Sequence, residues 1–111
     1  MNKLQIEVDT WIKTYGIRYY SELTNLGILM EEVGELARYI TRIYGDQSFK
    51  INEDALNAKA KISDELADIL FVTLCLSNQM NINIEEVFKR KMELRTIRDK
   101  ERHLNNPKLN S

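Results

Sequence analysis

Residues that turn the chain are scarce in this sequence, and this scarcity limits the available folds more than any other feature. The 111 residues include four Gly and one Pro, whereas average usage would give about thirteen. A sandwich or barrel of many short strands needs such residues at nearly every turn. We therefore expect long helices, arranged in a single domain because about 100 residues suit one domain.

The overall charge is close to balanced. Sixteen Lys and Arg oppose seventeen Asp and Glu, a net charge of −1. This balance disfavours a protein that binds nucleic acid or a membrane surface through a general electrostatic field, so we expect neither partner. The longest mainly apolar run, residues 69–76, is far below the ~18 residues of a membrane span.

The N-terminal residues and the single cysteine indicate the cellular compartment in which the protein is expected. Glu7 and Asp9 lie near the N-terminus, without the apolar run of a secretion signal. Cys75 has no internal disulfide partner, and it lies in an apolar stretch, which suits a small core residue in a reducing environment. We expect a cytoplasmic protein.

Apolar residues recur at helical spacing in four stretches, at about 2–15, 21–44, 58–80 and 84–101. Gly16 and Gly45 follow the first two stretches, as expected at helix ends. The stretch from Asp46 to Asn57 is polar and lacks a period, so we expect a loop there. The sequence predicts an all-α helical bundle of about four helices over 1–104, followed by a polar tail over 105–111.

The third stretch is apolar nearly all round, which predicts a central helix that is covered on most sides. One side of this helix can pack within the subunit, whereas Phe71, Val72 and Cys75 face other directions. The residues of the first side are Leu66, Leu70, Leu74 and Ser77. A chain this short has too few helices to cover them all, so we expect a homodimer or a dimer of dimers.

Two pairs of acidic residues lie where apolar side chains are expected. Glu32 and Glu35 are three residues apart in the second stretch, and Glu65 and Asp68 have the same spacing in the third. At 100° per residue, each pair is flanked by apolar side chains, whereas Glu31 falls on a polar face. An acidic pair on a helix is usually solvated, but two such pairs on apolar-flanked helices indicate a site.

Burying four carboxylates without compensation would cost several kcal/mol each, or force them to take up protons. A bound cation removes this cost. Oxygen ligands favour the hard ions Mg²⁺ or Mn²⁺ over Zn²⁺. The one histidine, His103, lies far along the chain in the C-terminal region and is expected to be solvated.

Two sequence motifs carry a family resemblance. The run Glu31-Glu32-Val33-Gly34-Glu35-Leu36-Ala37 is followed by Asp64-Glu65-Leu66-Ala67-Asp68-Ile69-Leu70. This ordered pair resembles the E-E-x-x-E and E-x-x-D signature of the all-α NTP pyrophosphohydrolase superfamily, in particular its MazG-like group. The resemblance covers about residues 26–98, most of the chain.

The resemblance implies a Mg²⁺-dependent enzyme that splits the α,β bond of a nucleoside triphosphate into a monophosphate and pyrophosphate. Glu32, Glu35, Glu65 and Asp68 would be the metal ligands. Glu31 would orient water or a second metal ion, so that all five acids count as catalytic. The substrates would be NTPs or dNTPs, in keeping with house-cleaning of the nucleotide pool, and the base and the sugar stay open.

Basic and aromatic residues supply candidates for the other parts of a nucleotide. From residue 89 to 102 there are seven Lys and Arg against three acids, and Lys91, Arg95 and Arg98 fall near one face. They are candidate phosphate ligands, although a basic helix end is more often a solvated surface. Arg95 stands where many members of the family carry Asn. Trp11 and Tyr39 are candidates to stack on the base, although aromatic residues are more often core.

Two alternatives remain at this point. The chain could be a non-catalytic helical interaction module whose acids pair with Lys or Arg of another subunit. It could also be a phosphoribosyl-ATP pyrophosphohydrolase, which shares the carboxylate arrangement. Members of that group commonly carry a His shortly after the second motif, and here residues 69–72 after Asp68 contain none.

Overall fold

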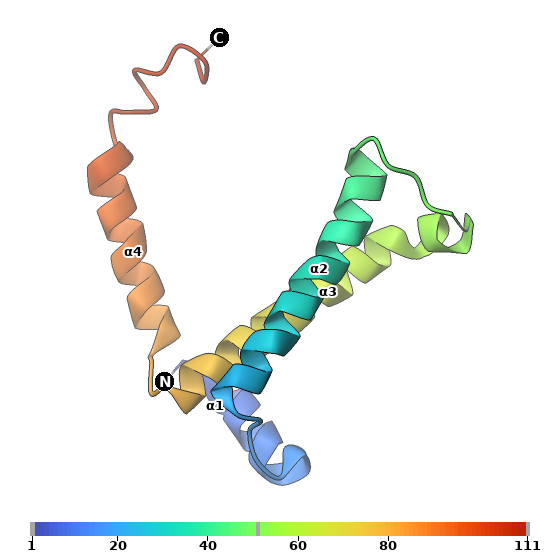
Figure 1. Ribbon diagram of the computed structural model, residues 1–111. Helices are drawn as coiled ribbons and strands as arrows, with labels where there is room; N and C mark the ends of the chain where they lie inside the picture. Colours follow the sequence, from blue (N-terminus) through green and yellow to red (C-terminus); the bar gives the residue numbers. More distant parts are fainter. Residues whose placement is uncertain (1, 51, 111) are drawn as a thin grey trace.

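The computed structural model describes residues 2–50 and 52–110, and this part of the chain is entirely helices, turns and loops (Figure 1). The elements in chain order are α1 (Lys3–Trp11), the short π-helix η1 (Ile12–Gly16), α2 (Glu22–Tyr44), α3 (Asn52–Gln79) and α4 (Ile84–Asp99). The prediction of an all-α protein with four main helices is confirmed.

The ends of α2 follow local chemistry that the sequence carries. Ser21 accepts a hydrogen bond from the backbone N–H of Thr24 at 3.2 Å, which satisfies an otherwise unpaired donor of the first turn. At the other end, a Cβ atom added to Gly45 would collide with the carbonyl oxygen of Thr41. Glycine is therefore the residue that lets the chain leave the helix there.

Two predicted boundaries differ from the structure. The expected loop over 46–57 is wrong in its second half, because α3 begins at Asn52. The added helical part contains Ala55, and Ala58 directly after it is fully buried. Alanine is the strongest helix former, so this part of the helix does not need a regular apolar period. The first helix also changes geometry, because its predicted last turn is the π-helix η1, which ends at Gly16 as expected.

α3 is the central helix, as predicted, because it packs along α2 and also against α1. Val8 and Ile12 from the first helical segment form a core with Leu74 and Cys75 of α3. The prediction that Cys75 and Val72 need a second subunit to cover them is wrong, since they are 3% and 5% exposed in this chain. The crossing of α1 over α3 covers this side.

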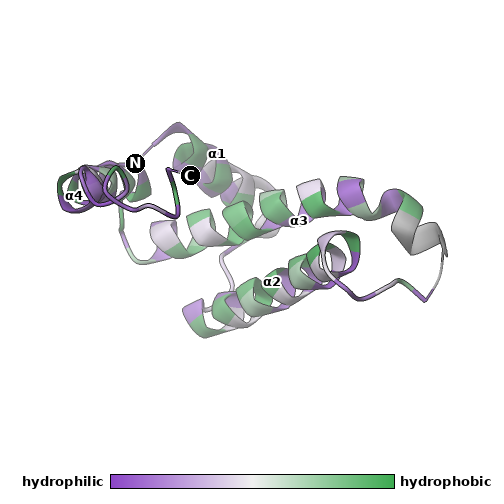
Figure 2. Ribbon diagram, turned by 90° about the horizontal axis from the view of Figure 1, so that it is seen from above, coloured by the Kyte–Doolittle hydropathy of each residue, from purple (hydrophilic) through white to green (hydrophobic). Residues whose placement is uncertain are grey.

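The side of α3 that was predicted to pack within the subunit is covered in its C-terminal half, where Leu74 and Ser77 are each 4% exposed, and is open in its N-terminal half. Leu66 is 53% exposed and Leu70 is 48% exposed, and Phe71 beside them is 37% exposed. Figure 2 shows hydrophobic positions at several places along α2 and α3. An uncovered apolar surface is therefore present. It includes Phe71, as predicted, and it extends to Leu66 and Leu70, which were predicted to pack within the subunit.

α4 projects away from the other three helices (Figures 1 and 2). None of its residues is buried, and Phe88 and Ile97 are 60% and 78% exposed. Within the described residues, three helices pack together, whereas α4 meets their core through Ile84 at its start and then leaves it, which corrects the expected four-helix bundle. None of the helices in this part of the chain has the length and apolarity to cross a membrane.

A buried glutamine joins the start of the chain to the α3–α4 turn. Gln5, only 1% exposed, donates to Asn78 Oδ1 at 2.9 Å and to the Ile82 carbonyl at 2.7 Å. Its Oε1 accepts from the backbone N–H of Ile84 at 3.1 Å. Because every polar atom of this amide is used, the glutamine fixes α1 against both sides of the turn.

Candidate active site

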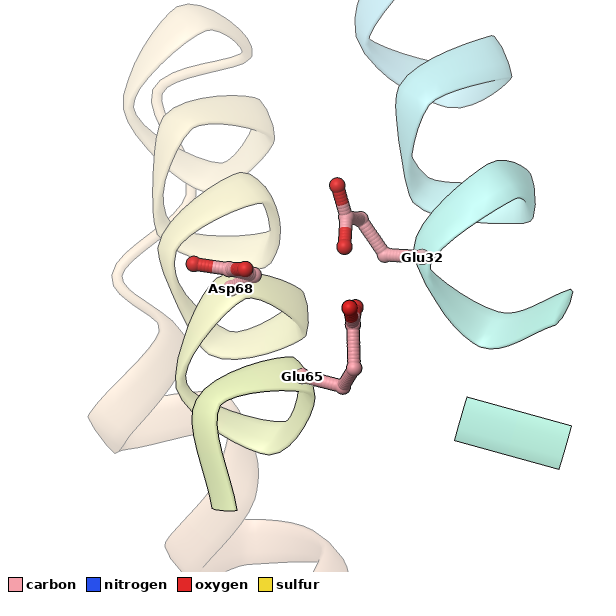
Figure 3. A group of neighbouring side chains, drawn as sticks. All are labelled: Glu32, Glu65 and Asp68. Atoms are coloured by element: carbon pink, nitrogen blue, oxygen red, sulfur yellow. The ribbon is translucent and has the colours of Figure 1, made fainter. Parts of the chain in front are cut away.

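Three carboxylates meet between α2 and α3 (Figure 3). Glu32 of α2 and Glu65 and Asp68 of α3 each offer an oxygen atom, and these atoms lie within 4.8 Å of one another. The three-residue spacing puts Glu65 and Asp68 on the same face of α3, where α2 packs. Glu32 and Glu65 are half-buried and Asp68 is exposed, so the cluster is open to solvent at one side.

The cluster is electrostatically unfavourable by itself. Glu65 Oε2 is shielded from solvent and has no hydrogen-bond partner among the described residues. The pKa of Glu65 is raised to about 7, first because a proton on it can be shared with Glu32 and then because of burial. The charges of Glu32, Asp68 and Glu35 raise this pKa further.

The two remaining predicted acids lie at the border of the cluster or outside it. Glu35 is exposed one turn beyond Glu32, and it is close enough for its charge to act on Glu65. Its oxygens are not among those within 4.8 Å of one another. Glu31 is exposed and is rotated by about 100° from Glu32 around the helix.

These residues fit a hard divalent cation. Oxygen atoms from three carboxylates converge, and a shielded oxygen of Glu65 lacks any donor in the described part of the chain. A shielded carboxylate oxygen without a partner is costly unless a cation or a proton compensates it. Mg²⁺ and Mn²⁺ accept such all-oxygen ligand sets, and the residues that would hold the ion are Glu32, Glu65 and Asp68, with Glu35 at the border.

A cleft of about 400 Å³ adjoins the acids, and Glu32 and Asp68 are part of its lining. Much of its wall is aromatic, supplied by Trp11, Tyr19, Tyr20 and Phe71. The Trp11 and Phe71 rings meet edge to face, with their centroids 5.9 Å apart. The structure thus places Trp11, predicted as a base-stacking residue, in a cleft that the acids border.

Tyr39, the other predicted stacking residue, lies outside the cleft. It is 6% exposed, and its ring centroid is 6.3 Å from that of Phe49. The Arg38 guanidinium carbon and the Lys61 ammonium lie over the ring, 5.4 and 5.6 Å from its centroid. The structure therefore places Tyr39 among protein groups, and its burial holds the α2–α3 loop against the helix pair.

The predicted phosphate ligands are on α4, and the structure does not bring them to the acids of the same chain (Figure 1). Lys91, Arg95 and Arg98 are all exposed. Arg98 donates to both carboxylate oxygens of Asp99, at 2.9 and 2.8 Å. This pairing lowers the pKa of Asp99 to about 2.

Sequence reasoning missed a chain of polar residues that fixes one wall of the cleft. The Tyr19 hydroxyl donates to Asp9 Oδ1 at 2.6 Å and accepts from Asn78 Nδ2 at 3.0 Å. Burial is the largest cause, and the bond to Asp9 the next, of a rise in the pKa of Tyr19 to about 12. The available signal was the pair Asn78 and Gln79 at the end of the most apolar helix, because buried amides need partners.

Comparison with known families agrees with this geometry. Residues 20–103 match the MazG nucleotide pyrophosphohydrolase domain. The matched segment contains the acidic residues of both motifs and all of α2, α3 and α4. The resemblance noted from the two motifs is thereby confirmed.

Similar proteins and structures come from Bacillus. The chain is 38% identical over 102 residues to YpjD of Bacillus subtilis (strain 168), covering 92% of this chain and 88% of the relative. It is 26% identical over 98 residues to YvdC of the same strain, covering 83% and 92%. The crystal structure of YPJD from Bacillus subtilis has a TM-score of 0.69 at 36% identity, over 83% of this chain and 88% of that one.

A second crystal structure is described as the Bacillus-conserved MazG protein, a nucleotide pyrophosphohydrolase. It has a TM-score of 0.65 at 34% identity and covers 81% of this chain and 82% of that one. The helices, the acidic motifs and these similarities agree. The chain belongs to the MazG family of nucleotide pyrophosphohydrolases.

Proposed function

We propose that this protein hydrolyses NTPs or dNTPs at the α,β bond with Mg²⁺, releasing a nucleoside monophosphate and pyrophosphate. Such an activity would remove unwanted nucleotides from the cellular pool. The observation that carries the proposal is the carboxylate cluster of Glu32, Glu65 and Asp68 at the border of an aromatic-lined cleft. The cluster suits a metal-bound polyphosphate, and the cleft suits a nucleoside.

In this proposal Glu32, Glu35, Glu65 and Asp68 hold the metal ion, which is Mg²⁺ or Mn²⁺. When bound, the ion would offset the charge of the phosphates and polarise a water molecule for attack at phosphorus. By holding the ion, the carboxylates would determine where the polyphosphate binds. Glu31, exposed next to Glu32, orients water or binds a second metal ion, and an acid that is not fully engaged takes the proton of the water.

The nucleoside lies in the cleft, with the base against Trp11. Indole rings provide a flat apolar surface for stacking, and the Trp11 side chain is 49% exposed at the cleft. The cleft volume of about 400 Å³ lies within the usual range for small-molecule sites. Lys91, Arg95 and Arg98 contact the phosphates, as charge-assisted hydrogen bonds to the leaving pyrophosphate would require.

Because α4 points away from the acids of its own chain, these cations would come from a second copy. Two neighbouring hollows of about 360 and 390 Å³ on the α1–α3 side share the apolar residues Leu4, Leu70 and Leu74. The uncovered apolar residues of α4 supply matching surface. We therefore propose a homodimer, or a dimer of dimers, with a composite active site.

The test is a panel of canonical and modified NTPs and dNTPs, read out by pyrophosphate release with Mg²⁺ and with a chelator. The proposal expects release of pyrophosphate and a monophosphate with metal and none with chelator. Calorimetric titration of Mg²⁺ is the companion measurement. If no nucleotide is cleaved and Mg²⁺ gives no binding signal with or without nucleotide, the non-catalytic interaction module is the better description.

A further inference from the structure

Three residues form an amide relay behind the cleft wall. Gln79 Nε2 donates to the backbone carbonyl of Tyr20, and Asn25 Nδ2 donates to Gln79 Oε1 at 2.8 Å. Asn25 is 5% exposed and is part of the cleft lining. The relay therefore connects a buried amide of the cleft to the backbone of the segment that forms its aromatic wall.

The direction of this relay is fixed by chemistry. A backbone carbonyl can only accept, so Gln79 must present its NH₂ to Tyr20 and its oxygen to Asn25. Asn25 must then turn its own NH₂ towards Gln79. Its Oδ1 accepts no hydrogen bond from any residue that the structure describes. The acceptor atom of Asn25 is thus left for a ligand in the cleft.

Other polar groups of this wall are already engaged. The Tyr19 hydroxyl donates to Asp9 and accepts from Asn78, so it has no second proton to offer. The carbonyl of Tyr19 accepts from Arg18 Nη1 at 3.0 Å. The Tyr20 carbonyl accepts from Gln79. Asn25 Oδ1 is therefore the amide acceptor on this wall that no described residue uses, and it can take a hydrogen bond from a base.

We propose that Asn25 is a specificity-determining residue that selects bases with an amino group at C4 of a pyrimidine or C6 of a purine, cytosine and adenine, over their keto counterparts, uracil and hypoxanthine. An amino N–H would donate to Oδ1, whereas a keto oxygen at the same position would face it lone pair to lone pair. This assignment rests on the proposed function, because it places a nucleoside in the cleft. It deepens that function by naming the substrate class.

The direct test compares substrates that differ only at this position. We expect kcat/KM to be at least about tenfold higher for dCTP than for dUTP, and for dATP than for dITP, because a keto oxygen leaves Asn25 Oδ1 unpaired. Equal values, or a preference for the keto bases, would overturn the assignment even if the enzyme hydrolyses triphosphates well.

Two variants separate base reading from a merely structural role. Asn25→Leu removes the acceptor, so the dCTP-to-dUTP ratio should fall towards one. Gln79→Met keeps Asn25 but leaves its amide free to turn over, so the ratio should also fall or invert. Gln47→Met, at an exposed glutamine of the α2–α3 loop, is the matched control and should keep the wild-type ratio. A ratio that both cleft variants leave unchanged would contradict the proposal.

Two further outcomes are decided by the same experiment. If Asn25→Leu does not fold, as judged by circular dichroism, the base selectivity is judged from the wild-type ratios and from Gln79→Met. If the wild type cleaves no triphosphate, the proposed function fails, and calorimetric binding of dCMP and dUMP tests the base assignment alone. Tighter binding of dCMP that Gln79→Met abolishes would support it, and equal binding would overturn it.

Discussion

The α2–α3 pair lacks charge compensation, whereas α4 lacks packing partners. α2 and α3 pack along most of their length, yet they bring three carboxylates within 4.8 Å and leave a shielded Glu65 oxygen without a partner. α4 has two ion pairs, Lys89 with Glu85 at 3.1 Å and Arg98 with Asp99, but it buries none of its residues. One region is packed but holds mutually repelling charges, whereas the other carries exposed, partly paired charges and is unpacked.

This contrast separates two needs that a single chain does not meet. The acidic cluster lacks compensating positive charge, and additional packing around it would not remove the repulsion. α4 lacks apolar surface to pack against, and further ion pairs would add little at exposed positions. The proposed metal ion would supply the first, and the proposed second copy would supply the second. Variants of the two regions can test whether charge compensation at the acids and packing of α4 are independent of each other.

The largest effect on turnover is expected from substitutions at the acidic residues of the proposed metal site. Glu65→Gln and Glu35→Gln should each lower turnover by at least about 100-fold, because each change keeps the shape but removes an anionic oxygen ligand. Without metal, neither variant should melt much below the wild type, since one of several repelling charges is gone. Steady-state kinetics and thermal unfolding in chelator check both points.

Glu101→Gln, at an exposed position after α4, is the control and should behave as the wild type. A large loss of thermal stability in metal-free Glu65→Gln and Glu35→Gln would show that these acids stabilise the fold, and it would contradict their assignment to a metal site.

The second effect concerns assembly. Leu70 borders both hollows of the α1–α3 side and is 48% exposed. Leu70→Glu should therefore dissociate the oligomer at micromolar concentration and lower activity together with assembly, by about 10-fold or more if the phosphates lose their cations. Analytical ultracentrifugation combined with activity across protein concentrations checks this.

Tyr44→Glu, at a position 70% exposed at the end of α2, is a control for adding charge to an exposed apolar site. A fully active wild-type species that sediments at 13.1 kDa, the mass of a single chain, would exclude the composite site.

The third effect is expected from the α4 cations. Lys91→Ala and Arg98→Ala should lower kcat/KM by about 10-fold or more, the range of a charge-assisted hydrogen bond, while Mg²⁺ affinity without nucleotide stays the same. Lys108→Ala, an exposed lysine of the tail, serves as the control. Unchanged kinetics in both α4 variants would indicate that the basic face of this helix is solvated and does not contact the phosphates.

The smallest effect concerns the cleft wall and its pH dependence. The pKa of Tyr19 is raised from 10 to about 12, so its folded state favours the protonated phenol. The stability that this hydroxyl contributes is therefore complete below pH 10 and is lost as the pH rises towards 12. Urea unfolding should show wild type more stable than Tyr19→Phe by about 1 kcal/mol at pH 8.

The difference should shrink between pH 10 and 12, because the unfolded phenol ionises before the folded one. A difference that stays constant across this range would mean that the Tyr19 hydroxyl is not held by Asp9 and Asn78 in solution.

Local patterns in the sequence were enough to predict the helices and the acidic faces. The spacing of Glu65 and Asp68 fixes their common side of α3 whatever packs there, and apolar flanks indicated that α2 would meet it. These are properties of one helix at a time, with a period of 3.6 residues. The sequence could therefore place three of the five predicted acids together.

Features that depend on how helices cross were not predictable in this way. Whether α1 covers Val72 and Cys75 or Leu66 and Leu70 depends on a crossing that no period encodes. The direction of α4 likewise depends on a turn and on its hydrogen bonds. Buried amides such as Asn78 are identified as structural or functional only when their partners are known, because an amide in a sequence is equally typical of a surface.

The buried Gln5 also makes two distant parts of the chain respond together. It bonds the backbone on both sides of the α3–α4 turn, at Ile82 and Ile84, and so the first helix determines where the C-terminal helix points. Loosening of α1 would release α4 in the same event, and exchange of the Ile84 amide proton would report it. A tag or deletion at the N-terminus would then change where the cations of α4 point, and in the proposed composite site it would alter catalysis at a distance.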